Sequence, residues 1–227
     1  MITEVIGVVK SGKEATVYCC RGGNPAGAEL VAAKIYRSRE HRNFKNDAEY
    51  WDGYAILDAR ARRAFKTKTE FGREAQFCLW IGREFETLKM LYDAGADVPR
   101  PIKQMGDAML MEFIGDLDTP AENLNKVKLQ PRDAPRLYER LMSQIELWLA
   151  HNRVHGDLSP YNIMHWKGAL TVIDFPQASD PRMNKNAFEL LRRDISNVYD
   201  YFSASGIKDD AFGRAANLWS RFLRSEL

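Results

Sequence analysis

His155-Gly156-Asp157-Leu158-Ser159-Pro160-Tyr161-Asn162, followed by Val172-Ile173-Asp174-Phe175, is the part of this 227-residue sequence that decides its fold. Between the two segments, two short strands flank a predicted turn at Trp166-Lys167-Gly168. Phosphoryl transfer requires a carboxylate that orients or deprotonates the acceptor, and oxygen ligands that hold Mg²⁺ against the phosphates. The two segments contain such groups in order. The alternative is a polar turn and a hairpin with incidental acidic residues.

Asp157 and Asn162, five positions apart, match the catalytic loop of protein kinases. Asp174-Phe175 stands where those enzymes have their metal-binding Asp-Phe pair. Gly156 replaces the arginine of the kinase motif His-Arg-Asp, so we expect no guanidinium at this point of the loop. His155 is interpreted as structural support for the loop.

Upstream, residues 31–35 (Val-Ala-Ala-Lys-Ile) resemble the kinase strand whose lysine contacts the α and β phosphates. The apolar neighbours would bury Lys34, and a buried ammonium requires an anionic partner. Glu84 and Glu86 compete for this pairing on a helix predicted over 71–93. We prefer Glu84, because it shares the inward stripe with Leu88.

Residues 7–18 (Gly-Val-Val-Lys-Ser-Gly-Lys-Glu-Ala-Thr-Val-Tyr) contain the GxxxxGK spacing of a P-loop. Position 14 is Glu, so the hydroxyl that such a loop gives to Mg²⁺ is missing, and a strand follows instead of a helix. We therefore interpret the segment as a kinase phosphate loop that is poor in glycine and keeps Gly12. Ser11 and Lys13 would offer a hydroxyl and an ammonium to the phosphates.

The combined motifs resemble the RIO family of atypical serine/threonine protein kinases, closest to its first subgroup, over about residues 5–202. The resemblance implies a two-lobed, protein-kinase-like α+β fold, with an antiparallel sheet in the N-lobe and a reduced, mainly helical C-lobe that is truncated after the metal-binding Asp. We expect the N-lobe at 1–111, a hinge at 112–115 and the C-lobe at 116–227. The motifs are Ser-Gly-Lys-Glu-Ala-Thr-Val-Tyr at 11–18, Val-Ala-Ala-Lys-Ile-Tyr-Arg at 31–37, Glu84-Phe85, Val-Pro-Arg-Pro at 98–101, Met-Glu-Phe-Ile-Gly at 111–115, the loop at 155–162 and Ile-Asp-Phe-Pro-Gln at 173–177.

The resemblance also implies an activity and site residues. The γ-phosphoryl of ATP would pass, with Mg²⁺ or Mn²⁺, to a protein acceptor or to the chain itself, in a role linked to maturation of the small ribosomal subunit. Asp174 could itself be the acceptor. The implied catalytic residues are Asp157, Lys34 and Asp174, the metal ligands are Asn162 and Asp174, and the nucleotide contacts are Ser11, Gly12, Lys13, Lys34, Glu84, Met111, Glu112, Ile114, Asn162 and Asp174.

Apolar periodicity predicts strands at 5–9, 16–20, 30–36 and 108–113. The prolines at 99 and 101 predict only extended chain before the last of these strands, and 115–132 is predicted to be a loop. Besides 71–93, helices are predicted from 131 or 133 to about 149, at 187–202 and at 209–223. Strands first and helices second are typical of an α+β architecture.

Composition excludes several classes of protein. With 45% hydrophobic residues, no apolar stretch near 18 residues and no cleavable leader, we expect a soluble cytoplasmic protein without membrane contact. The three cysteines, Cys19, Cys20 and Cys78, have no CxxC spacing, which favours core thiols over zinc or disulfides.

Net charge is only +2, but ten basic residues face six acidic ones between Arg37 and Arg73. This segment is either a solvated helix face or a site for an anionic partner such as ribosomal precursor RNA, bound through 60–73. The basic cluster is Arg60, Arg62, Arg63, Lys66 and Lys68.

Two other functions fit parts of the sequence. The pattern His-Gly-Asp-Leu-x-x-x-Asn is also similar to that of aminoglycoside and choline phosphotransferases, which act on small molecules. The basic segment would also suit a binding module for RNA or a preribosome that is gated by nucleotide.

Overall fold

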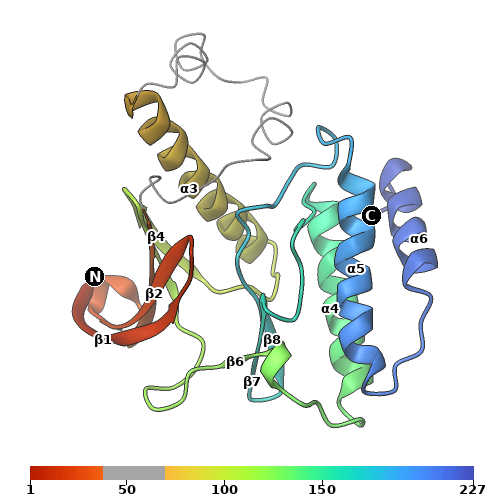
Figure 1. Cartoon of the computed structure of the whole chain (residues 1–227), viewed down its shortest axis with the longest axis horizontal. Helices are drawn as coiled ribbons and strands as arrows, with labels where there is room; N and C mark the ends of the chain where they lie inside the picture. The colour runs from red at the N-terminus through yellow and green to blue at the C-terminus, as the bar shows by residue number, and fades with distance from the viewer. Residues whose placement is uncertain (38–69) are drawn as a thin grey trace. The chain divides into compact units, whose positions relative to one another are not determined.

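The structure is a computed structural model that describes residues 1–37 and 70–227 (Figure 1). The basic cluster predicted at 60–68 lies outside the described residues. The chain divides into two compact units: the first comprises Met1–Lys89 and Pro99–Pro120, and the second comprises Met90–Val98 and Ala121–Leu227. The hinge expected at 112–115 stays a prediction.

The first unit is built on a five-stranded antiparallel sheet, as the α+β prediction requires. Its strand order is β1-β2-β3-β5-β4, with bounds Ile2–Ser11, Ala15–Gly22, Leu30–Tyr36, Ala108–Glu112 and Pro101–Met105. Strand β4 was not predicted, because two prolines and the polar pair Lys103-Gln104 interrupt the alternation of apolar and polar residues that is typical of a strand. Pro101 is tolerated as the first residue of an edge strand, where no ladder N–H is required.

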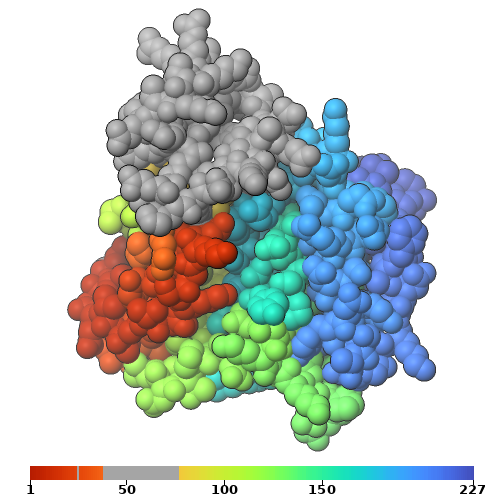
Figure 2. Space-filling view, in the orientation of Figure 1, coloured from red at the N-terminus to blue at the C-terminus, as the bar shows by residue number. Residues whose placement is uncertain are grey.

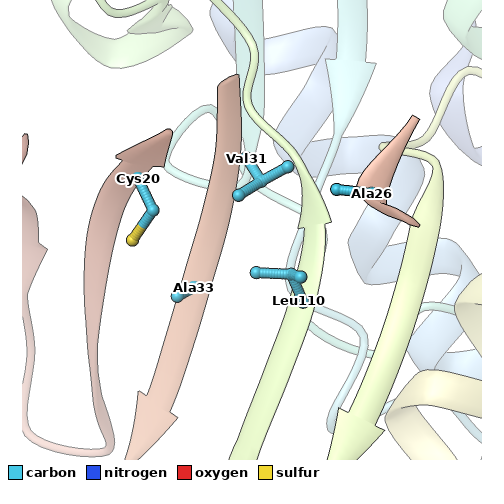
Figure 3. Close-up of a cluster of buried hydrophobic side chains, with 5 residues drawn as sticks. All are labelled: Cys20, Ala26, Val31, Ala33 and Leu110. Carbon is cyan, nitrogen blue, oxygen red and sulfur yellow. The ribbon is translucent and has the colours of Figure 1, made fainter. Parts of the chain in front are cut away.

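A small apolar cluster packs on one face of this sheet (Figure 3). Its buried members come from β2, β3, β5 and a 3₁₀ turn, η1 (Asn24–Ala26). Tyr18, Ala28, Ile35 and Ile102 pack against it in partly buried positions. The alternation of side chains along each strand places these residues on one face, and the members are Cys20, Ala26, Val31, Ala33 and Leu110.

Strand β1 is an irregular edge of the sheet. Its pairing with β2 shifts register between Ile2 and Glu4, between Val5 and Gly7, and between Val8 and Lys10. Val5 and Val8 are each 60% exposed. The edge therefore combines apolar side chains with a broken hydrogen-bond ladder.

Helix α3 (Glu70–Asp93) carries the inward stripe that the periodicity predicted. Phe77, Ile81, Glu84 and Leu88 are all buried. Cys78 is exposed, so its prediction as a core thiol is wrong: next to Phe77 on a helix, it points away from the stripe. Cys19 and Cys20 in β2 are buried, as predicted.

The second unit contains three helices, α4 (Ala134–Ala150), α5 (Ala187–Ser203) and α6 (Ala211–Leu223), which pack side by side. Both α5 and α6 reach the molecular surface in Figure 2. Within 115–132, which was predicted to be a loop, the chain forms strand β6 (Glu122–Asn123) and a 3₁₀ turn, η3 (Leu124–Lys126).

Strand β6 pairs with β7 (Ile163–Trp166), and β7 forms the predicted hairpin with β8 (Ala169–Val172). No described helix is long and apolar enough to cross a bilayer.

Candidate active site

Lys34 and Glu84 form a buried ion pair in the first unit. Lys34 Nζ lies 2.7 Å from Glu84 Oε1, and both side chains are largely withdrawn from water. The other carboxylate oxygen, Oε2, accepts a hydrogen bond from the hydroxyl of Tyr36. Strand β3 thus supplies two donors to one carboxylate of α3. The sequence reasoning missed Tyr36, although its position two residues after Lys34 places both on the same face of the strand.

The predicted phosphate loop is the turn between β1 and β2. Its backbone is closed by a hydrogen bond from Gly12 N to Ala15 O at 2.9 Å. Arg37 donates to Ser11 Oγ at 2.6 Å, so the hydroxyl expected to meet phosphate is held by a cation at the end of β3. Lys13 stands in the same turn and is exposed.

The expected adenine contacts lie at the end of β5. Met111 is buried and pairs in register with Ala32 of β3. Glu112 donates its N–H to the carbonyl of Arg100 at 2.8 Å and pairs in register with Val31 of β3. Ile114 follows the strand in a half-buried position.

The second unit brings Asp157 and Asn162 together in one loop. Asn162 Nδ2 donates to the backbone carbonyl of Asp157 at 2.9 Å and approaches its carboxylate at 3.4 Å. Partial loss of hydration raises the pKa of Asp157, and the charge of Asp174 acts in the same direction, whereas Arg193 and Asn162 lower it. Two carboxylates and one amide therefore share this part of the fold, as a site for metal and phosphate requires.

His155 connects the loop at 155–162 to the segment that carries Asp174. Its Nδ1 accepts from the backbone N–H of Asp157, and its Nε2 lies 3.3 Å from the carbonyl of Ile173, which assigns the ring proton to Nε2. The ring packs against Phe175 at 4.6 Å between centroids. Burial lowers the pKa of His155 to about 4, so the imidazole is neutral. This agrees with a structural role.

Two residues of α5 hold the loop, and sequence reasoning found neither. Asp194 is buried and accepts from the backbone N–H of Gly156 at 2.7 Å and of Leu158 at 2.9 Å. Arg193 donates to the carbonyl of Gly156. Position 156 itself carries no guanidinium, as expected for glycine, and a helix far along the chain supplies one to the same loop.

The loop cannot carry an arginine at position 156, because the backbone there accommodates only glycine. Its φ is +78°, and a Cβ at this position would lie 2.8 Å from the carbonyl oxygen of Gln177. A side chain at 156 would thus be strained and would collide with backbone.

The donor set fits a hard divalent cation that shares its coordination with phosphate. The amide nitrogen of Asn162 is used within the loop, which leaves Oδ1 as the atom for a cation. Ile173 N donates to the carbonyl of Asn162 at 2.9 Å, next to Asp174 in the chain. Among the described residues no group of three or more His, Cys, Asp or Glu could hold a metal alone. Mg²⁺ commonly takes one or two protein oxygens together with phosphates and water.

Comparison with known sequences gives one family. The profile of the RIO domain matches residues 16–213. RIO-type serine/threonine-protein kinase Rio1 of Haloferax volcanii is 34% identical over 205 residues, which cover 90% of this chain and 65% of that protein. The serine/threonine-protein kinases RIO1 of Chaetomium thermophilum and Homo sapiens are 32% and 31% identical, with 91% and 89% of this chain covered. The chain spans 41% and 34% of their lengths.

Comparison with solved structures agrees on the fold. The Rio2 kinase of Chaetomium thermophilum, solved as an ADP/Mg²⁺-phosphoaspartate complex, superposes with a TM-score of 0.64. The match covers 97% of this chain and 66% of that one at 21% sequence identity. The predicted α+β fold of the kinase type is confirmed.

Proposed function

The chain belongs to the RIO family, and we propose on that basis that it is a phosphotransferase that uses ATP and a divalent metal as an atypical serine/threonine kinase or ATPase. The observation that carries the proposal is the loop of the second unit, where Asn162 is bonded to Asp157 and two backbone N–H groups are fixed by Asp194. These bonds satisfy two backbone N–H groups on either side of Asp157 and so fix the position of that carboxylate in the loop.

Each residue then has a defined task. Lys34, held by Glu84, would bind the α and β phosphates, and Ser11, Gly12 and Lys13 would line the phosphate loop. Met111 and the backbone of Glu112 and Ile114 would contact adenine. Asp157 would orient the acceptor hydroxyl and accept its proton. Asn162 and Asp174 would hold Mg²⁺ or Mn²⁺, which neutralises charge on the phosphates.

The first test is incubation with γ-labelled ATP and Mg²⁺, without added acceptor, followed by measurement of label on protein and as free phosphate. Asp157→Asn should lower both by about 100-fold or more, the usual contribution of a general base. Asp200→Asn, a matched change at an exposed position of α5, should leave both unchanged. Equal turnover in the wild type and Asp157→Asn would refute the proposal.

The identity of the acceptor is a further part of the proposal. We propose a protein acceptor, with Asp174 as a site of phosphorylation in the chain itself. Label that is released by hydroxylamine and maps to the peptide containing Asp174 would support this assignment. Label confined to hydroxyl side chains would exclude it.

The proposed biological setting is maturation of the small ribosomal subunit. Its support is family membership and the basic composition of 60–73. Neutralising the five basic residues at 60, 62, 63, 66 and 68 should weaken binding to precursor RNA and flatten its salt dependence. Unchanged RNA binding would refute the ribosomal setting and leave the proposed enzymatic activity unaffected.

A further inference from the structure

The structure assigns Tyr36 as a positioning residue: its hydroxyl holds the carboxylate of Glu84 so that Lys34 stays ready for the phosphates of ATP. The inference deepens the proposed function and rests on it. It concerns the first unit alone.

The two oxygens of Glu84 have separate donors. Lys34 donates to Oε1 at 2.7 Å and Tyr36 donates to Oε2. Both donors come from the same face of β3, and Lys34 Nζ also lies 5.0 Å from the centroid of the Tyr36 ring. The three side chains therefore contact one another between one strand and one helix.

Packing fixes the tyrosine independently of its hydrogen bond. Tyr36 is 2% exposed, and its ring meets Trp80 and Phe77 of α3 edge to face, at 5.2 and 6.4 Å between centroids. Burial raises the pKa of Tyr36 well above its usual range, and Glu84 acts in the same direction. The hydroxyl therefore stays protonated and serves as a donor.

A second hydrogen-bond donor to Glu84 matters because bound ATP would compete with this carboxylate for the ammonium of Lys34. When phosphates approach Lys34, they draw on the same ammonium that neutralises Glu84. Glu84 is only 3% exposed, so water cannot replace a lost hydrogen-bond donor. Weaker donation from Lys34 would leave a buried negative charge with too few hydrogen bonds. The hydroxyl of Tyr36 keeps the carboxylate bonded while the ammonium is shared. Lysine alone is a flexible point charge and does not fix the orientation of a carboxylate.

The test compares Tyr36→Phe with Tyr138→Phe. Tyr138 of α4 is a close chemical match: it is 2% exposed, it donates to Asp209 Oδ2 at 2.7 Å, and Asp209 also pairs with Arg214. It belongs to the second unit and to none of the proposed nucleotide contacts. Binding of ATP and of adenosine is measured for each protein in the presence of Mg²⁺.

Tyr36→Phe should weaken binding of ATP about tenfold, which equals about 1.4 kcal/mol, and leave adenosine within about twofold. Tyr138→Phe should change neither affinity, even if it lowers the midpoint of unfolding as much as Tyr36→Phe does. Equal loss for ATP and adenosine would show a purely structural role and overturn the inference, as would unchanged ATP affinity. Wild-type protein that binds ATP no better than adenosine would instead refute the proposed function itself.

If Tyr36→Phe does not fold, 3-fluorotyrosine at position 36 gives the second measurement. The fluorinated phenol is a stronger donor of similar size, so ATP should bind at least as tightly as to the wild type. Weaker ATP binding with adenosine unchanged would overturn the inference.

Discussion

Asp194 is predicted to make the stability of the protein fall as pH rises from about 4 to about 7. Burial raises the pKa of its carboxyl to about 7, although the N–H groups of Gly156 and Leu158 and the charge of Arg193 oppose the shift. In the unfolded chain the pKa of an aspartate is about 3.9. Between these values the folded state binds one proton more than the unfolded state, so the free energy of unfolding decreases as pH increases.

The magnitude follows from the two pKa values. A difference of about three units, at 1.36 kcal/mol each, gives about 4 kcal/mol over the whole window. Between pH 5 and 8 the expected loss is about 2–3 kcal/mol, because part of the window lies below pH 5.

Asp194→Asn removes this titration and keeps the size of the side chain. The difference in unfolding free energy, wild type minus variant, should therefore fall by about 2–3 kcal/mol from pH 5 to pH 8. The depressed pKa of His155 makes stability rise with pH between about 4 and 6.5, but it is present in both proteins and cancels in the difference.

Urea unfolding followed by tryptophan fluorescence at four pH values measures this difference. Parallel curves for the two proteins would refute the reasoning. A difference that grows with pH would show that the two backbone N–H groups stabilise the carboxylate by more than burial costs it.

Two further predictions concern the same loop. Gly156→Ala should destabilise the protein by about 1–2 kcal/mol because of the left-handed backbone alone, and by more because the new Cβ would contact the carbonyl of Gln177. The variant should also lose the turnover that depends on Asp157. Urea unfolding measures the first effect, and the labelled-ATP assay measures the second. Arg193→Ala should shift the acidic limb of the pH–rate profile to higher pH, because Arg193 lowers the pKa of Asp157, and Arg193→Lys should shift it less; an unmoved limb in the alanine variant would contradict this.

Short-range patterns explain what the sequence could predict. Asp157 and Asn162 are five residues apart, so a local motif contains both. The pairing of Lys34 with Glu84 spans 50 residues, but each partner has its own local signature: an apolar strand around the lysine, and an inward helical stripe that carries the glutamate. Strand and helix periodicity likewise predicted most elements of the fold.

The residues that were missed act through tertiary contacts without a motif. The hydrogen bonds that Asp194 accepts from Leu158 and Gly156 join residues that are 36 and 38 positions apart in the sequence. One signal was present, since Asp194 interrupts the buried apolar stripe of α5 next to Ile195 and Val198. A lone acid on such a stripe must have buried donors, but the sequence does not say which ones.

The irregular pairing of β1 also bears on whether a strand of another molecule can add to this edge of the sheet. A straight edge strand with exposed valines would offer a continuous row of N–H and C=O groups to a strand of another molecule. Here the ladder keeps step for only two residues at a time, at Glu4-Val5, Gly7-Val8 and Lys10-Ser11. Each bulge twists the strand and misaligns the groups beyond it. A strand of another molecule would therefore find only short aligned stretches along this edge.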